Sequence, residues 1–136
     1  MNQRGDNRQD VDDGSPQPVK KVYWVPHTHW DREWYRSFQA FRARLVDSID
    51  AVLDKLPAEP EFKFLLDGQT VVLEDYFEIR PERESEVRRA VAEGRLAIGP
   101  WYVQPDSLLP CGEAHIRNLL LGRAYSYDIG HVSKIA

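Results

Sequence analysis

The sequence predicts an α/β protein in which βα units repeat along the chain and their strands form a parallel sheet. Three observations lead to this fold class. Short apolar segments alternate with longer segments whose apolar residues recur at helical spacing. Their order is strand, helix, strand, helices, strand, helix, followed by the opening of a fourth strand. Polar residues come directly after each of the first three expected strands, and parallel sheets carry their sites at the carboxyl ends of their strands.

The first expected unit is a strand followed by a long helix. Lys20 to Val25 is short, apolar and largely β-branched or aromatic, and Pro26 suits the end of a strand because it lacks a backbone donor. From Glu33 to Leu56 the apolar side chains, Trp34 included, recur at steps of three and four. The sequence therefore predicts one helix with a single apolar stripe, which Pro57 ends.

The rest of the chain continues the alternation. The further expected strands share a short apolar run, and they cover 62–66, 96–98 and the opening at 131–136. The further expected helices share helical spacing, and they cover 69–79, 82–93 and about 113–127. The helix at 82–93 begins after Pro81 and has only a thin apolar face. Residues 1–18 are polar and are expected to form a disordered tail, which leaves 19–136 for the folded domain.

Composition argues against several functional classes. A net charge of −4 argues against binding to nucleic acid, which requires a basic face. No apolar run reaches the roughly 18 residues of a membrane span, and the N-terminus lacks the pattern of a secretion signal, so the default expectation is a cytoplasmic protein. Cys111 is the only cysteine, which excludes an internal disulfide and a cysteine-based metal cluster.

The most informative motif follows the first expected strand, where His27, His29 and Asp31 alternate. Alternate residues of an extended backbone share a face, and imidazole nitrogens and carboxylate oxygens are ordinary ligands of zinc or a similar divalent ion. The motif therefore predicts half of a metal site. The alternative interpretation is that Asp31 caps the long helix and the histidines are ordinary polar residues. Spacing leaves open whether His27 is a ligand, an orienting residue or a donor to substrate.

Carboxylates and aromatic rings at the other strand ends favour a sugar site, because sugar C–H faces stack on rings while hydroxyls bind carboxylates. Asp67 follows the second expected strand, and the segment from Trp101 to Asp106 follows the third. Each residue also has a structural interpretation. Asp67 suits a turn before Gly68, Asp106 suits a loop, and Trp34 suits a core position at the start of the apolar stripe.

Three motifs carry a more specific signal, and they are His-Thr-His-Trp-Asp-Arg-Glu-Trp at 27–34, Phe-Leu-Leu-Asp-Gly-Gln at 64–69, and Gly-Pro-Trp-Tyr-Val-Gln-Pro-Asp at 99–106. Together they resemble the glycoside hydrolase family 38 α-mannosidases, in particular the bacterial branch that includes mannosylglycerate hydrolases. The resemblance runs from Lys20 to the end of the chain. It implies a distorted α/β barrel, of which 19–136 would be the N-terminal portion, truncated in the fourth strand.

This resemblance implies a retaining, zinc-dependent hydrolase of terminal α-mannosides. By position, His29 and Asp31 match two zinc ligands, and Trp34 matches an aromatic residue that packs against the bound sugar. The remaining motif residues would bind substrate or shape its site, and they are His27, Asp67 and Asp106.

The family's nucleophile and general acid match no residue of this chain and would lie beyond Ala136. The resemblance therefore implies an N-terminal fragment that is inactive alone. It implies an α-mannoside and one zinc ion as partners, without nucleic acid or membrane, and allows an oligomer for the full-length enzyme. Two alternatives stay open. One is a non-catalytic sugar- or metal-binding remnant, and the other is a metal-dependent carbohydrate deacetylase on a related barrel, because His-x-Asp after a first strand also suits that chemistry.

Overall fold

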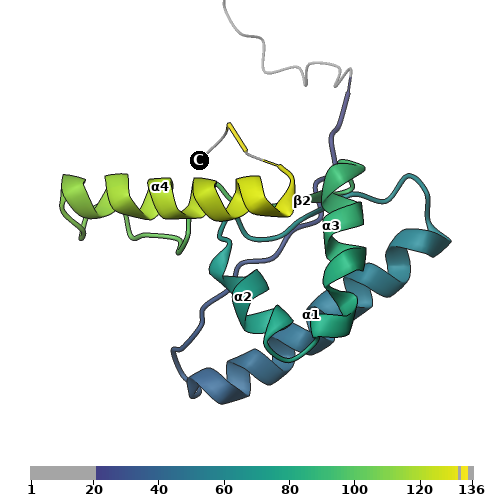
Figure 1. Cartoon of the computed structure of the whole chain (residues 1–136), viewed down its shortest axis with the longest axis horizontal. Helices are drawn as coiled ribbons and strands as arrows, with labels where there is room; N and C mark the ends of the chain where they lie inside the picture. Colours follow the sequence, from purple (N-terminus) through teal and green to yellow (C-terminus); the bar gives the residue numbers. More distant parts are fainter. Residues whose placement is uncertain (1–20, 132, 135–136) are drawn as a thin grey trace, which may run out of the picture.

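The computed structural model describes residues 21–131, 133 and 134, and within them helices surround a small parallel sheet (Figure 1). Strands β1 (Phe64–Leu65) and β2 (Leu96–Ala97) pair in parallel. Two isolated parallel bridges extend this pairing. His27 pairs with Leu65 at the edge of β1 away from β2, and Gln69 pairs with Trp101 in the segments that follow the two strands. The predicted α/β class with a parallel sheet is confirmed, and the sheet is much smaller than predicted.

The helices follow the predicted order, and they are α1 (Phe38–Ala58), α2 (Val71–Phe77), the 3-10 turn η1 (Pro81–Arg83), α3 (Glu84–Ala92) and α4 (Gly112–Ile129). Helix α1 packs against both α2 and α3. Helix α4 lies on the opposite side of α2 from α1 in the view of Figure 1. Apolar spacing therefore located α1, α2 and α3, each of which buries apolar side chains in the core. Helix α4 also lies where the sequence predicted a helix, but Ile116 and Leu120 on it are exposed.

The core lies between these helices and β2. Its fully or nearly fully buried members include Leu45, Ile49 and Leu53 of α1, Val72, Leu73 and Tyr76 of α2, Val87 and Val91 of α3, and Leu96 and Ile98 around β2. Burying one large apolar side chain contributes about 1.5–3 kcal/mol, so this cluster supplies the main stabilising term. The apolar stripe of α1 and the thin apolar face of α3 are both confirmed.

The long helix begins later than predicted. Its first residue is Phe38, and residues 32–36 form bends instead of helix. Arg32 is held by Asp75 of α2, and Ser37, the N-cap, has extended backbone angles. A tertiary contact therefore overrides the helical spacing here, and the prediction that Trp34 belongs to the buried stripe is wrong. At the other end, Pro57 lies in the last turn instead of following it.

The first predicted strand is also wrong over its described part. Val22 to Val25 form no strand and are exposed, and pairing with β1 begins after them, at the bridge between His27 and Leu65. An apolar run becomes a strand only when a partner lies beside it. At the predicted fourth strand His131, Ser133 and Lys134 are not in a strand, while positions 132, 135 and 136 lie outside the described residues, as does the predicted tail at 1–18.

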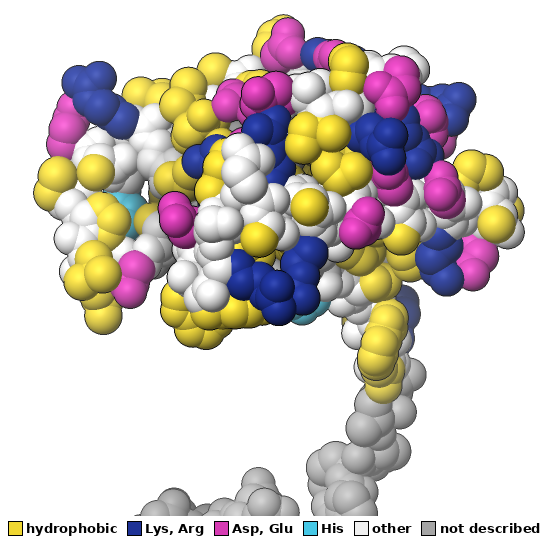
Figure 2. Space-filling view, turned by 90° about the horizontal axis from the view of Figure 1, so that it is seen from below, with side chains coloured by type: hydrophobic (Ala, Val, Ile, Leu, Met, Phe, Trp, Pro, Cys, Tyr) yellow, Lys and Arg dark blue, Asp and Glu magenta, His cyan; other side chains and the backbone are white. Residues whose placement is uncertain are grey.

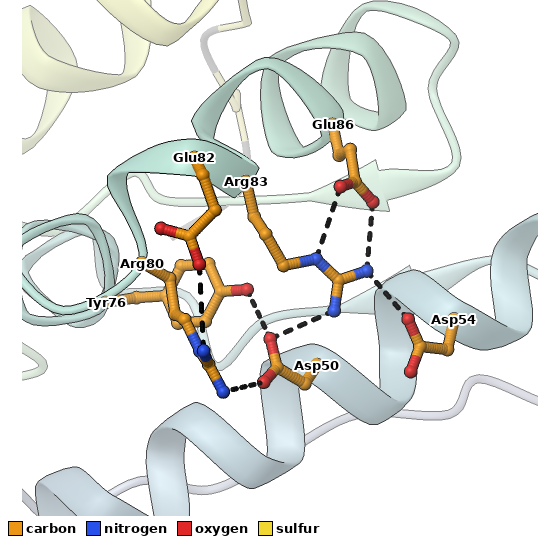
Figure 3. Close-up of polar contacts among 7 residues, drawn as sticks. All are labelled: Asp50, Asp54, Tyr76, Arg80, Glu82, Arg83 and Glu86. Atoms are coloured by element: carbon orange, nitrogen blue, oxygen red, sulfur yellow. Dashed lines mark hydrogen bonds and ion pairs between the residues drawn. The ribbon is translucent and has the colours of Figure 1, made fainter.

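A polar network joins α1 to the connection between α2 and α3 (Figure 3). One carboxylate oxygen of Asp50 accepts hydrogen bonds from the Tyr76 hydroxyl at 2.6 Å and from Arg83 at 3.0 Å. Its other oxygen pairs with Arg80 at 3.1 Å. Because Tyr76 belongs to α2, the network fixes that helix on α1.

The surface carries charges of both signs. Figure 2 shows acidic and basic side chains interspersed among apolar ones on one face. In the part of the chain that the structure describes, none of the helices combines the length and the apolar character that crossing a membrane requires.

Candidate functional site

A cavity of about 860 Å³ lies beside the segments that follow the strands. Its lining comes from the segment after the His27 bridge, from the start of α1, from the turn after β1 and from the loop after β2, and it comprises His29 to Glu33, Phe38, Gln69 and Val103 to Asp106. This is the carboxyl edge of the parallel pairing, where the sequence predicted a site. The volume is in the range of small-molecule sites.

The carboxylate of Asp67 joins these segments to one another. Its Oδ2 accepts hydrogen bonds from the Trp30 backbone N–H at 2.7 Å and from the Gln69 side-chain amide at 2.5 Å. The same amide donates to the Trp30 carbonyl oxygen at 2.6 Å. With its amide nitrogen turned toward Asp67, Gln104 donates to the Asp67 backbone oxygen and to Oδ1, each at 3.0 Å. Asp67 therefore ties the end of β1 to both neighbouring segments.

The backbone of Asp67 explains how its side chain reaches them. Its φ of 41° lies in the left-handed region, which Asp and Asn tolerate better than most residues, and Gly68 follows with a φ of 62°. Burial raises the pKa of Asp67, and the nearby charge of Asp31 acts in the same direction. Hydrogen bonds from Gln69 and Trp30 oppose this rise. Asp67 is thus both the turn residue and the buried centre of a polar network.

His29 lies between two carboxylates of different character. Its Nδ1 is 3.9 Å from Oδ1 of Asp67, and its Nε2 is 3.8 Å from Oδ1 of Asp31. The Asp67 side chain is 4% exposed, whereas those of Asp31 and His29 are 42% and 72% exposed. Nδ1 of His29 therefore lies near a buried, hydrogen-bonded carboxylate, and Nε2 lies near a carboxylate that is open to the cavity.

The distance between His29 and Asp31 fits a shared divalent ion. Two donor atoms that each lie about 2.0–2.2 Å from zinc are at most about 4.4 Å apart, and Nε2 and Oδ1 are within that limit. An imidazole and a carboxylate are also chemically suitable donors for zinc. Among the described residues, no group of three or more histidine, cysteine or acidic side chains comes together as a metal site. The residues present therefore fit as two ligands of a larger set.

Arg32 forms a part of the site that sequence reasoning missed. Its guanidinium donates to both carboxylate oxygens of Asp75, at 2.8 Å each, and its charge lies 4.9 Å from the centre of the Phe38 ring. The hydrogen bond to Asp75 raises the pKa of Arg32, although burial opposes the rise. Arg32 and Phe38 both line the cavity. Because the partners are 43 positions apart, spacing alone offered no signal for this pair.

Helix α4 holds the third lining segment in place. Oδ1 of Asn118 accepts hydrogen bonds from the backbone N–H groups of Tyr102, at 3.1 Å, and Val103, at 2.9 Å, while its Nδ2 donates to the Val103 carbonyl oxygen at 2.6 Å. Sequence reasoning assigned Asn118 no role. The available signal was an asparagine inside a helix, where its side chain competes with helical hydrogen bonds and therefore often serves another partner.

Two of the predicted site residues lie outside the cavity. His27 donates from Nδ1 to the neighbouring Thr28 carbonyl oxygen at 3.0 Å, and it lines a separate depression with Tyr23 and Phe64. Trp34 is 75% exposed and contacts Tyr35 edge to face. Their roles toward substrate stay predictions.

The other four predicted residues gather at one place. His29, Asp31 and Asp106 line the cavity, and Asp67 lies behind its lining. Oδ1 of Asp106 accepts a hydrogen bond from the Leu108 backbone at 3.3 Å, so Asp106 also fulfils the loop role that the sequence allowed.

Comparison with protein families and curated proteins points to a single group. The family model described as "Glycosyl hydrolases family 38 N-terminal domain" matches residues 19–135. A protein of Halalkalibacterium halodurans named "Putative mannosylglycerate hydrolase" is 48% identical over 104 residues, which are 76% of this chain and 12% of the relative. "Alpha-mannosidase G" of Dictyostelium discoideum is 28% identical over 106 residues, which are 77% of this chain and 10% of the relative.

Solved structures agree with these relatives. An α-mannosidase from Enterococcus faecalis V583 matches with a TM-score of 0.77 and 44% identity over 80% of this chain and 12% of that structure. A family 38 glycosyl hydrolase from Enterococcus faecalis matches with a TM-score of 0.75 and 39% identity over 82% of this chain and 13% of that structure. The chain thus spans between 10% and 13% of the length of these four proteins.

Proposed function

The chain belongs to glycosyl hydrolase family 38, and from this premise we propose that it acts as part of a retaining, zinc-dependent hydrolase of terminal α-mannosides. The observation that carries the proposal is the convergence of His29 and Asp31 beside a cavity of about 860 Å³. The cavity accommodates a sugar ring, and both residues lie inside the segment that the family model covers.

We place the chain in the first part of a distorted α/β barrel. The parallel pairing of β1 with β2 and the alternation of strands with helices support this placement. In a barrel the polar residues after successive strands meet at one rim, as the residues around the cavity do. Residues 19–136 then form the N-terminal portion of the catalytic domain, with 1–18 as a tail before it.

Nε2 of His29 and the carboxylate of Asp31 would hold the zinc ion together with ligands from elsewhere in the protein. When bound, zinc would supply Lewis-acid binding of sugar hydroxyls and favour distortion of the ring. The side chains of Gln104 and Asp106 line the same cavity and are suited to hydrogen bonds with further hydroxyls. Trp34 is proposed to pack against the sugar, and His27 and Asp67 to shape the site without touching the reacting carbon.

The two catalytic carboxyl groups are assigned to other parts of the protein. A retaining glycosidase needs a nucleophile and a general acid about 5–5.5 Å apart. Asp31 is committed to the metal in this proposal, and Asp67 is buried behind the cavity lining. We therefore expect the 136-residue chain alone to be inactive toward an α-mannoside.

The experiment compares the 136-residue chain with the protein in which this sequence continues to its natural end. An aryl α-mannoside is supplied with zinc and with a chelator. The longer protein is expected to release mannose with retained anomeric configuration, and His29→Ala or Asp31→Asn is expected to lower kcat/KM about 100-fold or more. His131→Ala, which removes an exposed histidine away from the cavity, serves as the control. Hydrolysis by the 136-residue chain alone would refute the assignment of the catalytic groups to other parts of the protein.

The same assay separates the two alternatives that the sequence left open. Binding of mannose without turnover by the longer protein would indicate a non-catalytic sugar-binding protein. Release of acetate from an acetylated mannoside, without cleavage of the glycosidic bond, would indicate a deacetylase.

A further inference from the structure

We propose that Asp67 is a positioning residue that sets the orientation and the proton of His29, and that it is a ligand of neither the metal nor the sugar. The inference rests on the proposed function, because it concerns how this chain binds the divalent ion. Its starting point is that one imidazole has a different carboxylate at each of its two nitrogens, Asp67 at Nδ1 and Asp31 at Nε2.

The surroundings of Asp67 keep its carboxylate in place. Oδ2 accepts hydrogen bonds from the Trp30 backbone and the Gln69 amide, and Oδ1 accepts one from the Gln104 amide. The side chain is almost fully buried and does not line the cavity. Moving this carboxylate to coordinate an ion in the cavity would break these bonds and leave their donors buried without partners. Asp67 is thus unsuited to be a ligand.

In contrast to Asp67, Asp31 is not buried, and within the part of the chain that the structure describes it is not held by several hydrogen bonds. Its carboxylate lines the cavity and is partly exposed, and among the described residues the His29 ring is the partner that faces it. A carboxylate with free lone pairs is available to a cation without breaking existing contacts. The two carboxylates that flank His29 therefore have different roles, and Asp31 is the one that binds the metal.

The protonation of the imidazole explains how Asp67 acts on Nδ1 of His29. A neutral imidazole carries one proton, and the nitrogen without the proton is the one that binds a metal. A carboxylate beside Nδ1 holds the proton there and leaves the lone pair on Nε2, which faces Asp31. The 3.9 Å between Nδ1 and Oδ1 exceeds a hydrogen bond by about 1 Å. Because the His29 side chain is largely exposed, its ring has the freedom to close this gap.

The left-handed backbone of Asp67 provides well-matched variants. Asn tolerates a φ of 41° as well as Asp does, and Gly tolerates it without strain. Asp67→Asn keeps the size and an acceptor oxygen but loses the charge, while Asp67→Gly removes the side chain. Both variants therefore test the carboxylate while leaving the turn able to form.

The test is made in the protein that carries this chain at its natural length. Zinc affinity is measured by competition with a chelating dye, and cobalt is used as a spectroscopic probe of the coordination. Asp67→Asn is expected to weaken zinc binding about 10- to 100-fold and to change the visible cobalt spectrum. The melting temperature of the metal-free protein is expected to fall as well, because the amide nitrogen of Asn cannot accept the hydrogen bond from Gln104. Asp47→Asn, which neutralises an exposed carboxylate of α1 outside the cavity lining, is expected to change neither affinity nor spectrum.

Wild-type zinc affinity and an unchanged cobalt spectrum in Asp67→Asn would overturn the inference, and so would a lower melting temperature with unaltered affinity. If Asp67→Asn does not fold, Asp67→Gly decides by the same measurements. Failure of the proposed function is distinguishable, because then His29→Ala and Asp31→Asn would also bind zinc normally.

Discussion

Arg32 and Asp75 form a two-point ion pair in which Nε and Nη2 of the guanidinium each lie 2.8 Å from a different carboxylate oxygen. Asp75 is part of α2, and Arg32 follows Asp31 directly in the chain. The pair therefore attaches the proposed metal-binding segment to a core helix. That helix is itself held on α1 by the hydrogen bond from Tyr76 to Asp50. The position of Asp31 thus depends on contacts that reach through α2 to α1.

Removing the charge of Arg32 is expected to destabilise the fold. In Arg32→Met the apolar stem remains, but the Asp75 carboxylate, 8% exposed, loses its cation. Loss of one partner of a buried pair costs about 3–5 kcal/mol, and we expect about 2 kcal/mol here because the Arg32 side chain is 40% exposed. Urea unfolding followed by circular dichroism measures this difference.

Asp75→Asn combined with Arg32→Met provides the control for that prediction. With no charge left in the pair, the double variant is expected to recover part of the lost stability. A change below about 0.5 kcal/mol in Arg32→Met would show that the pair contributes nothing measurable.

Asp50 is expected to make the stability of the fold sensitive to acid. Burial alone would raise the pKa of Asp50, but hydrogen bonds from Tyr76 and Arg83 and the charge of Arg80 outweigh burial and lower it. A lowered folded-state pKa means that the contribution is complete above the unfolded pKa of about 3.9 and is lost as the pH falls through the folded-state value. The free energy of unfolding should therefore fall below about pH 4 more steeply in wild type than in Asp50→Asn.

Unfolding measured at a series of pH values from 7 down to 3 checks this prediction. At pH 7 Asp50→Asn should cost about 1–2 kcal/mol, because charge-assisted bonds to two arginines are lost. Asp47→Asn, an exposed position on the same helix, should leave both the stability and its pH dependence unchanged. Parallel pH profiles for wild type and Asp50→Asn would contradict the assignment.

Gly122 is expected to be required where α4 meets the loop after β2. A Cβ atom at this position would overlap backbone atoms of Pro100, Trp101 and Tyr102. Gly122→Ala should therefore push the helix away and cost about 1–3 kcal/mol, despite the better helix propensity of alanine. Gly112→Ala in the same helix meets no atom within 4 Å and should be neutral or slightly stabilising. Equal melting temperatures for the two variants would refute this explanation.

Asn118 is expected to keep the loop from Tyr102 to Asp106 ordered. Asn118→Ala removes the acceptor of two backbone N–H groups and should lower stability by about 1–2 kcal/mol. Amide hydrogen exchange at Tyr102 and Val103 is expected to become faster, which locates the effect. Asn118→Asp keeps the acceptor oxygen and should retain most of the protection. Unchanged exchange in Asn118→Ala would show that another contact orders the loop.

Local patterns were sufficient for most of the helical framework. The apolar stripes of α1 and α3 follow from spacing, because a helix buries one face whatever it packs against. The sequence placed His29, Asp31 and Asp106 after expected parallel strands and so predicted their gathering at one cavity, although a single bridge at His27 stands in place of the first of these strands. Both inferences depend only on nearby residues in the sequence or on a general property of parallel sheets. The amino-acid sequence alone was therefore sufficient to make them.

Local sequence patterns failed to predict secondary structure where it depends on contacts with residues far away in the chain. The spacing that placed Trp34 in a helix was overridden by the pairing of Arg32 with Asp75, and the apolar run at Val22 to Val25 found no strand beside it. These outcomes depend on residues far away in the sequence, and propensity carries no information about them.

The sequence by itself determined the family, the order of helices and strands, and the donor types available for a divalent ion. Only the tertiary structure decided the different environments of the two acids. Asp67 is buried and hydrogen-bonded behind His29, whereas Asp31 is open to the cavity. The physical reason is that a carboxylate's role depends on its desolvation and its hydrogen-bond donors, and both are set by segments that fold against it.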